Sequence, residues 1–349
     1  MHVKNAKFPS SIKEPVVARI GAGKTLSLPN DKITLPLLSL NFKDHLEEGD
    51  VIMIRPNGSV FVLFHSLSQH NTLFTTARCN SSCLMCSQPP RHYDDIDFWD
   101  NINRKILELV PKETKHLGVS GGEPTLLGPK LNDLLENIKL TQPNAEVDVL
   151  TNGRALAWRN NVKRLAALEH ERIIYAIPVH SDYYQIHDYI AQSANAFFQT
   201  LEGIHNLARY KLRIEIRIVL HRQSSSRLKS LSLFIYKNMP FVEHVAFMAL
   251  EYTGHTPRNR DLLWIDPYEY MGDLLEAVEL LSINGIEVSL YNMQLCLLPK
   301  ALWKFNRFSI SEWKQLYVDE CRDCLLRSEC GGLFISSKRR RSAHIKPFK

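Results

Sequence analysis

Three of the seven cysteines stand close together in the stretch Arg78-Cys79-Asn80-Ser81-Ser82-Cys83-Leu84-Met85-Cys86-Ser87-Gln88-Pro89-Pro90, where their spacing is C-x3-C-x2-C. At this chain's cysteine frequency such a run arises by chance with a probability of about 0.003. Thiolates select zinc, copper(I) or iron–sulfur clusters, and a closed zinc site needs four protein ligands. Three cysteines instead suit a four-iron cluster in which one iron keeps an open coordination position. The run therefore predicts a metal site at Cys79, Cys83 and Cys86 that can accept an external ligand.

The composition is that of an ordinary globular protein, with 44% hydrophobic and 23% charged residues among 349. No apolar run approaches the roughly 18 to 20 residues of a membrane span, and the first ten residues lack the apolar region of a signal peptide. Seven cysteines in two groups fit metal ligands in a reducing compartment better than a disulfide framework. We therefore expect a cytoplasmic protein without a membrane partner.

The net charge of +6 comes in large part from the C-terminus, at Lys338-Arg339-Arg340-Arg341 and the last lysines. A solvated basic tail is the simplest interpretation of this run. Attraction of an acidic peptide or of RNA is the alternative.

Residues 1–70 predict a small β-rich appendage. Val51–Arg55 and Val60–Phe64 are apolar runs separated by Pro56-Asn57-Gly58-Ser59. Asn-Gly accepts the positive φ angles of a type I′ turn, so this segment predicts a β-hairpin. We assign no chemistry to it.

Between residues 71 and 255, strand and helix patterns alternate. Strands are expected at 73–76, 116–120, 146–151, 173–179, 212–220 and 242–250, with helices at 99–110, 131–140, 161–168, 197–210 and 227–237. This alternation predicts an α/β fold, a parallel sheet of six units that forms an open or partial (β/α)6 barrel. Residues 256–349 are expected to form a separate C-terminal region.

Polar residues follow each predicted strand, where parallel sheets gather ligand groups. They are the cysteine loop, Gly121-Gly122-Glu123-Pro124, Asn152-Gly153, His180-Ser181-Asp182, His221-Arg222 and Glu251. Two glycines let the backbone approach a ligand closely, and Glu123 can accept hydrogen bonds from a cationic amino group. His180, His187 and Asp188 are candidates for lining a substrate cavity.

The remaining cysteines are a full set of four thiols in the C-terminal region. They are Cys296, Cys321, Cys324 and Cys330. A zinc ribbon fits this count.

The cysteine run, with Gly-Gly-Glu one unit later, resembles the radical S-adenosylmethionine (radical SAM) superfamily. The resemblance implies that S-adenosylmethionine (SAM) binds the open iron and is cleaved reductively to a 5′-deoxyadenosyl radical, which abstracts a substrate hydrogen. Met85 departs from the pattern, which usually has an aromatic residue there. No catalytic residue beyond the cluster is indicated.

The resemblance also implies positions for the cofactor contacts. Gly121, Gly122 and Glu123 would hold the methionine amino group. Further candidate contacts, for which a structural role is an equal alternative because Thr, Asn and Ser often cap helices, are Thr151, Asn152, Ser181 and Arg217. The four C-terminal cysteines resemble a SPASM or twitch extension holding an auxiliary four-iron four-sulfur cluster, which we favour over zinc.

Longer segments resemble the HxsC family, the His-Xaa-Ser system radical SAM maturases. These segments are Cys83-Leu84-Met85-Cys86-Ser87-Gln88-Pro89-Pro90, Gly121 to Gly128, Leu150 to Arg154, Leu262 to Pro267, Tyr291 to Cys296 and Cys330-Gly331-Gly332. The family implies a small His-Xaa-Ser repeat protein as substrate, a partner radical SAM maturase, and an electron donor of flavodoxin or ferredoxin type. The alternatives are a radical SAM enzyme acting on RNA or a small molecule, an iron–sulfur electron-transfer protein and a zinc-binding interaction module; nucleic acid is the less expected partner.

Overall fold

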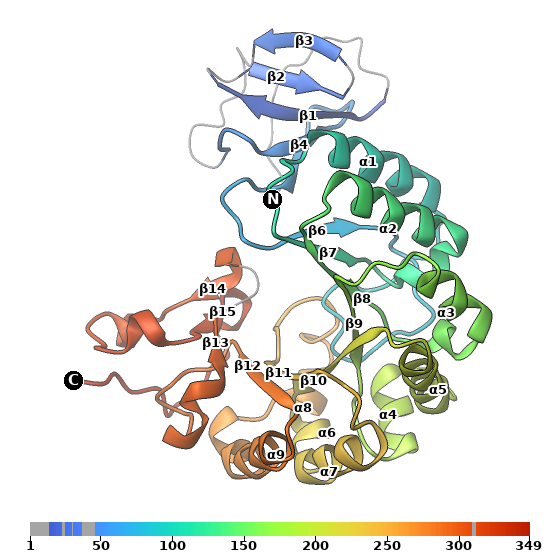
Figure 1. Cartoon of the computed structure of the whole chain (residues 1–349). Helices are drawn as coiled ribbons and strands as arrows, with labels where there is room; N and C mark the ends of the chain where they lie inside the picture. The colour runs from blue at the N-terminus through green and yellow to red at the C-terminus, as the bar shows by residue number, and fades with distance from the viewer. Residues whose placement is uncertain (1–13, 23–24, 30, 37–45, 309–311) are drawn as a thin grey trace.

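The computed structural model describes residues 14–22, 25–29, 31–36, 46–308 and 312–349. An N-terminal antiparallel sheet, a larger parallel sheet flanked by helices, and a C-terminal extension follow one another along the chain (Figure 1). The predicted α/β architecture with an appendage at each end is confirmed.

The N-terminal sheet has the strand order β3-β2-β1-β4-β5. Its strands are β1 (Val16–Gly21), β2 (Thr25–Leu28), β3 (Asp31–Pro36), β4 (Val51–Ile54) and β5 (Val60–Phe64). The predicted hairpin is formed by β4 and β5, which pair in antiparallel register. The two strands have the predicted bounds, except that β4 ends one residue earlier, at Ile54.

The turn of this hairpin is not the predicted type I′. Gly58 has a φ of +78°, but Asn57 is not among the residues with positive φ. A type I′ turn needs positive φ at both central residues, whereas Pro56 holds φ near −65° at the first central position. The chain therefore turns through Pro56 and Asn57, and the Gly58 N–H donates to the Arg55 carbonyl at 2.8 Å.

The N-terminal sheet shares its core with the barrel. One face has its own apolar cluster of Ala18, Ile20, Leu26, Ile52, Ile54 and Val60. The residues of the other face belong to the main core, together with side chains of α1 (Ile96–Leu109); they are Val17, Val51, Met53 and Phe64. The N-terminal sheet is thus packed against α1, the first helix of the parallel sheet, and is not joined to the barrel through the connecting chain alone.

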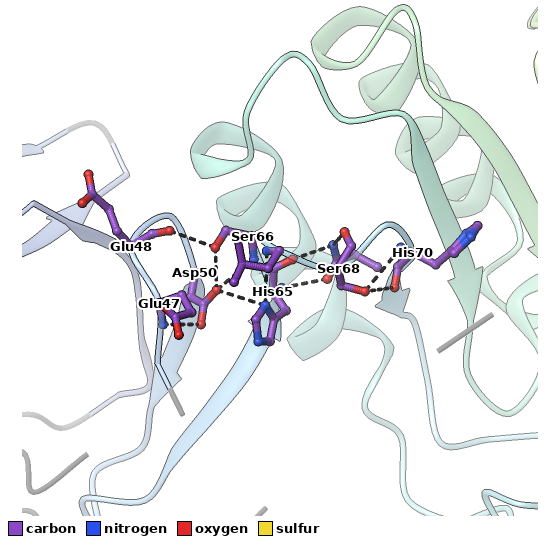
Figure 2. Close-up of polar contacts among 9 residues, drawn as sticks. Glu47, Glu48, Asp50, His65, Ser66, Ser68 and His70 are labelled. Atoms are coloured by element: carbon purple, nitrogen blue, oxygen red, sulfur yellow. Dashed lines mark hydrogen bonds and ion pairs between the residues drawn. The ribbon is translucent and has the colours of Figure 1, made fainter. Parts of the chain in front are cut away.

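A buried carboxylate also fixes the loop that leads from the N-terminal sheet to the strand that begins the barrel (Figure 2). Asp50 is fully buried and accepts hydrogen bonds from the Ser66 N–H at 2.8 Å and the Glu47 N–H at 3.0 Å. Asn71 accepts from the His65 N–H at 2.7 Å. The loop between β5 and β6 is fixed at both ends, because an unpaired buried carboxylate or amide would be costly.

The parallel sheet contains the six predicted strands. They are β6 (Asn71–Phe74), β7 (His116–Ser120), β8 (Glu146–Leu150), β9 (Ile173–Pro178), β10 (Arg213–Leu220) and β11 (His244–Ala249). The connecting helices are α1, α2 (Pro129–Thr141), α3 (Arg159–Ala166), α4 (Tyr184–Ala191), α5 (Ala196–Arg209), α6 (Arg222–Ser225) and α7 (Leu228–Asn238). The five predicted helices are confirmed, and α4 and α6 are additional. No helix in the described ranges is long and apolar enough to cross a bilayer.

The parallel sheet continues beyond the predicted boundary at residue 255. β12 (Glu287–Tyr291) pairs in parallel with β11, and β13 (Asn306–Arg307) pairs with β12. α9 (Met271–Ile283) makes the crossover, buries Leu274 and Leu281 in the main core and lies against α7. The short helix α8 (Arg260–Leu263) and an Asp266 to Glu269 capping box precede it. The segment 256–307 is therefore mostly barrel, because an apolar helix stripe followed by a strand repeats the earlier βα units.

The C-terminal extension carries a two-stranded sheet, β14 (Gln315–Leu316) with β15 (Leu333–Phe334). The basic tail is solvated in part: Lys338, Arg339 and Arg341 are exposed, but the tail also contacts the rest of the protein. Ile345 is buried, Arg341 pairs with Glu320 at 2.6 Å, and the Arg340 guanidinium lies over the Trp264 ring. The apolar residues between the tail's charges hold it on the protein.

Candidate metal and cofactor site

The cysteine loop leaves the carboxyl end of β6 and lies on an apolar floor. Leu84 and Met85 are buried against Ile190 and Leu263, and Cys83 packs on this cluster. The Leu84 N–H donates to the Ile190 carbonyl at 2.9 Å, so α4 supports the loop through its backbone. Met85 thus serves as an apolar contact.

The three thiols are close enough to influence one another. Burial, and then the charges of Glu123 and Cys86, raise the pKa of Cys79 to about 11. Burial and the two other cysteines raise the pKa of Cys83 to about 12, and burial also raises the pKa of Cys86. Such thiols become thiolates only beside a compensating cation, which bound metal supplies. The residues present therefore fit a thiolate-ligated metal cluster.

Gly121 and Gly122 pack against the start of the cysteine loop. The Gly122 N–H donates to the Thr76 carbonyl at 2.6 Å, and the Glu123 N–H donates to the Arg78 carbonyl at 2.8 Å. A Cβ on Gly122 would lie 2.1 Å from the Arg78 carbonyl oxygen. The close approach that the two glycines allow is to the protein's own backbone; their contact with a cofactor stays a prediction.

Glu123 is fully buried, and its carboxylate is occupied by protein donors. It accepts from the Thr125 N–H at 3.0 Å and hydroxyl at 2.6 Å, from the Thr151 hydroxyl, and from the Asn152 N–H at 2.7 Å. Burial raises the pKa of Glu123, and these hydrogen bonds oppose the rise. The side chain joins the loops after β7 and β8, and its predicted contact with an amino group stays a prediction.

Asn152 is a predicted contact that lies beside one of the thiols. Its side-chain amide donates to the Asn80 side chain at 2.6 Å and lies 3.9 Å from the Cys79 sulfur. Thr151 is buried beside it, held by Glu123. The end of β8 is therefore built into the cysteine loop.

Ser181 and Arg217 have protein partners instead. The Ser181 hydroxyl accepts from the Tyr183 N–H at 3.2 Å, which is the local turn that begins α4. Arg217 donates to Glu215 on the same face of β10. Neither is joined to the cysteine loop by a hydrogen bond among the described residues, so both stay predictions as cofactor contacts.

Glu215 is the centre of a polar group inside the sheet. Its carboxylate lies 2.7 Å from His244 Nδ1, and His244 Nε2 lies 2.9 Å from the Ser289 hydroxyl. Burial alone would raise the pKa of Glu215, but His244 and Arg217 outweigh burial and lower it to about 2. The positive charge of Arg217 is therefore already balanced by the Glu215 carboxylate.

Two supports of the cysteine loop had no predicted role. Arg154 donates to the Asn80 carbonyl, to the Ser81 hydroxyl at 3.1 Å and to the Ser193 hydroxyl at 2.7 Å. Arg154 lies just after β8, in the segment Leu150 to Arg154 named in the sequence analysis. Its role could not be predicted, because an arginine at a strand end has many possible partners.

The second support is the segment after β11. The His255 N–H donates to the Cys86 carbonyl at 2.8 Å, and the Asn259 side chain donates to the Leu84 carbonyl at 2.7 Å. Gly254 has a φ of +61°, and a Cβ there would lie 2.1 Å from the Cys86 carbonyl oxygen. Only glycine allows this approach. In the sequence, the only sign of this contact was a glycine shortly after the end of β11.

His180, His187 and His221 form a buried group behind the loop. The His180 and His187 ring centroids are 5.0 Å apart. Burial and the charge of Arg154 lower the pKa of His187 to about 4; burial and His180 lower the pKa of His221 to about 3. Asp188 caps α5, accepting from the Phe197 N–H at 2.8 Å. These histidines are buried and neutral, and the lining of a substrate cavity by His180, His187 and Asp188 stays a prediction.

Acidification is expected to destabilise the metal-free chain through these histidines. Their pKa values lie below the unfolded value of about 6.5, so the unfolded state binds more protons and stability falls as pH drops below that value. His187 and His221 together should cost on the order of 4 kcal/mol of unfolding free energy between pH 7 and pH 5. Urea unfolding at the two pH values measures this. His187→Gln should remove about half of the loss; an unchanged pH dependence would contradict the assignment.

The C-terminal thiols form a second group. Cys296, Cys321, Cys324 and Cys330 line one small cavity, together with Lys346 and Phe348 of the tail. The Leu295 N–H lies 3.4 Å from the Cys330 sulfur, and the Phe348 N–H 3.4 Å from the Cys324 sulfur. Backbone N–H groups aimed at sulfur stabilise thiolate ligands, so the residues fit a bound metal group.

Within the described ranges, no three His, Cys, Asp or Glu side chains converge as ligands of a single metal ion. A four-iron cluster is held by thiolates on different irons, so its ligands need not meet at one point. The spacing of the thiols in both groups is therefore not that of a site for a single metal ion.

A parallel α/β sheet with three thiols after its first strand is the arrangement of a radical SAM domain. Residues 73–232 match the family model described as the radical SAM superfamily. This segment, from β6 to α7, is therefore a radical SAM domain. No curated protein matches the chain.

Two solved structures share the fold. Streptococcus suis SuiB bound to S-adenosylmethionine has a TM-score of 0.52 and 14% identity, covering 74% of this chain and 56% of that one. SuiB bound to the precursor peptide SuiA has a TM-score of 0.51 and 16% identity, covering 66% of this chain and 50% of that one. The chain spans only about half the length of these structures. At such identities the similarity establishes the fold alone.

Proposed function

We propose that this chain is a radical SAM enzyme that modifies a peptide or protein, and that its substrate is a small His-Xaa-Ser repeat protein. The observation that carries the proposal is the loop of Cys79, Cys83 and Cys86 at the carboxyl end of β6, inside the matched segment. The Asn152 amide beside Cys79 and the Gly121-Gly122 backbone against the loop support it.

Each part of the loop has a role in this proposal. Cys79, Cys83 and Cys86 would hold a four-iron cluster. When bound, the cluster and S-adenosylmethionine supply a 5′-deoxyadenosyl radical. The apolar floor of Leu84 and Met85 keeps water from one side of the loop. Gly121, Gly122, Glu123, Thr151 and Asn152 remain the proposed cofactor contacts. Glu123, Ser181 and Arg217 would have to exchange protein partners for a ligand.

The C-terminal thiols would hold an auxiliary four-iron cluster rather than zinc. Support comes from the four cysteines around one cavity and from the backbone N–H groups directed at two of their sulfurs. Metal analysis of the chain purified without oxygen tests this, since zinc in place of iron in the C-terminal site would contradict it.

A peptide substrate is supported by two independent lines. The segments between residues 83 and 332 resemble the HxsC family, and the solved structure of SuiB with its precursor peptide shares the fold. A partner radical SAM maturase, a flavodoxin or ferredoxin type electron donor and a cytoplasmic location belong to the same proposal. The RNA alternative has less support from the basic tail, because Arg340 lies over Trp264 and Arg341 pairs with Glu320, although Lys338 and Arg339 are exposed.

The test is 5′-deoxyadenosine formation after anaerobic reconstitution, with S-adenosylmethionine and a chemical reductant, with and without the His-Xaa-Ser protein. We expect product in both cases, more of it with the peptide, and a changed peptide mass. A loss of hydrogen mass would indicate an oxidative change such as a crosslink. A fully iron-loaded chain that forms no 5′-deoxyadenosine would contradict the proposed activity.

A further inference from the structure

An open cleft lies beside the third cysteine of the loop. Two segments line it, one just after the cysteine loop and one just after β11; they are Pro89 to Tyr93, and Gly254, His255 and Arg258. None of these residues belongs to a strand. The cleft is therefore formed by loops that follow β6 and β11.

The cleft carries uncompensated positive charge. Neither Arg91 nor Arg258 has an ion-pair partner within the described ranges. The neighbouring carboxylates are engaged elsewhere, because Asp94 pairs with Arg78 at 3.1 Å and the buried Asp95 accepts from Thr76 at 2.6 Å. Two free guanidinium groups on one concave surface attract a partner of negative charge.

Only backbone separates the cleft from Cys86. The Gly254 position lacks a side chain where it meets the Cys86 carbonyl, and the His255 N–H donates to that carbonyl at 2.8 Å. On the other side, Ser87 and Gln88 are exposed. A protein seated in the cleft would thus stand directly against one ligand of the proposed cluster. Tyr93, with 62% of its surface exposed, offers an aromatic contact at the rim.

We propose that this cleft is the docking site of an acidic one-electron carrier protein. The inference rests on the proposed function, which requires the cluster to be reduced. The carrier loses one electron and the cluster held by Cys79, Cys83 and Cys86 gains it, with no bond formed. Arg91 and Arg258 orient the carrier through its acidic surface and increase the rate of productive encounters.

Reduction of the reconstituted chain tests the proposal without requiring turnover. The rate at which reduced flavodoxin bleaches the cluster's visible absorbance is compared with the rate for a small chemical reductant. In the Arg91→Glu/Arg258→Glu variant, the flavodoxin rate at low salt should fall at least about five-fold, while the chemical rate stays unchanged. Added salt should reduce the difference in flavodoxin reduction rate between the wild type and the variant. The variant Arg159→Glu/Lys237→Glu, with the same charge change at exposed sites on α3 and α7, should keep both rates.

Three results would overturn the proposal. The first is an unchanged flavodoxin rate in the Arg91→Glu/Arg258→Glu variant, which places docking elsewhere. The second is an equal fall with both reductants, which makes the arginines supports of the cysteine loop. The third is loss of peptide modification with carrier reduction intact, which assigns the cleft to the substrate. An absence of 5′-deoxyadenosine in all samples would contradict the proposed enzyme activity but leave the reduction rates readable.

Discussion

Replacing Cys79 with alanine is expected to reduce 5′-deoxyadenosine formation to background. Cys79 is one of only three thiols in the loop, and two thiolates do not secure a four-iron cluster. The C-terminal thiols are unaffected, so about four of roughly eight irons should remain in the reconstituted chain. Product formation and iron per chain are measured on the same sample. The paired readout separates loss of the proposed active site from general failure to assemble clusters.

A matched control lies next to the third cysteine. Ser87 is exposed and is not a proposed ligand, so Ser87→Ala should keep both product and iron. Cleavage that survives in Cys79→Ala would refute the assignment of the active site. Loss of all iron in that variant would show instead that the two thiol groups do not load independently.

The fold could be predicted where the pattern was regular. The strands from β6 to β11 have apolar residues facing the helices, and each is followed by a helix with one apolar stripe, so the βα units were evident. Residues 256–349 were expected to form a separate region, but β12 joins the parallel sheet, and its place there depends on the contact between α9 and α7, which is made far apart in the sequence. In the hairpin, Pro56 rather than Asn57 decided the turn.

The site was predicted as a set of positions and less well as a set of contacts. Asn152 does come to Cys79, as its place at a strand end indicates. Glu123 was predicted as a cofactor contact, and the structure shows that its carboxylate accepts four hydrogen bonds from the loops after β7 and β8, which depends on how the two loops meet. The contacts of Arg154 and Gly254 with the cysteine loop could not be predicted either. Each is made to a backbone carbonyl far away in the sequence, and such contacts leave little trace in a single sequence.

Gly122→Ala is expected to produce the largest loss among variants that leave every thiol in place. The added Cβ would lie 2.1 Å from the Arg78 carbonyl oxygen and 2.5 Å from its carbon, and a backbone group cannot move aside as a flexible side chain can. The hydrogen bond from the Glu123 N–H to the same carbonyl would be displaced with it. Because Arg78 directly precedes Cys79, the cysteine loop shifts away from Asn152. We expect the iron of the cysteine loop to fall at least about ten-fold in occupancy, since a misplacement of about 1 Å is costly at such a site.

The control for this variant is another glycine-to-alanine change. Gly272, in the first turn of α9, has nothing within 4 Å of an added Cβ, so Gly272→Ala should keep full iron and be stabilised by up to about 1 kcal/mol. C-terminal iron should be retained in both variants, because those thiols are remote from the clash. Full iron in the cysteine loop of Gly122→Ala would mean that the loop adapts to the added carbon, and that close contact between the Gly-Gly-Glu turn and Arg78 does not position the thiols.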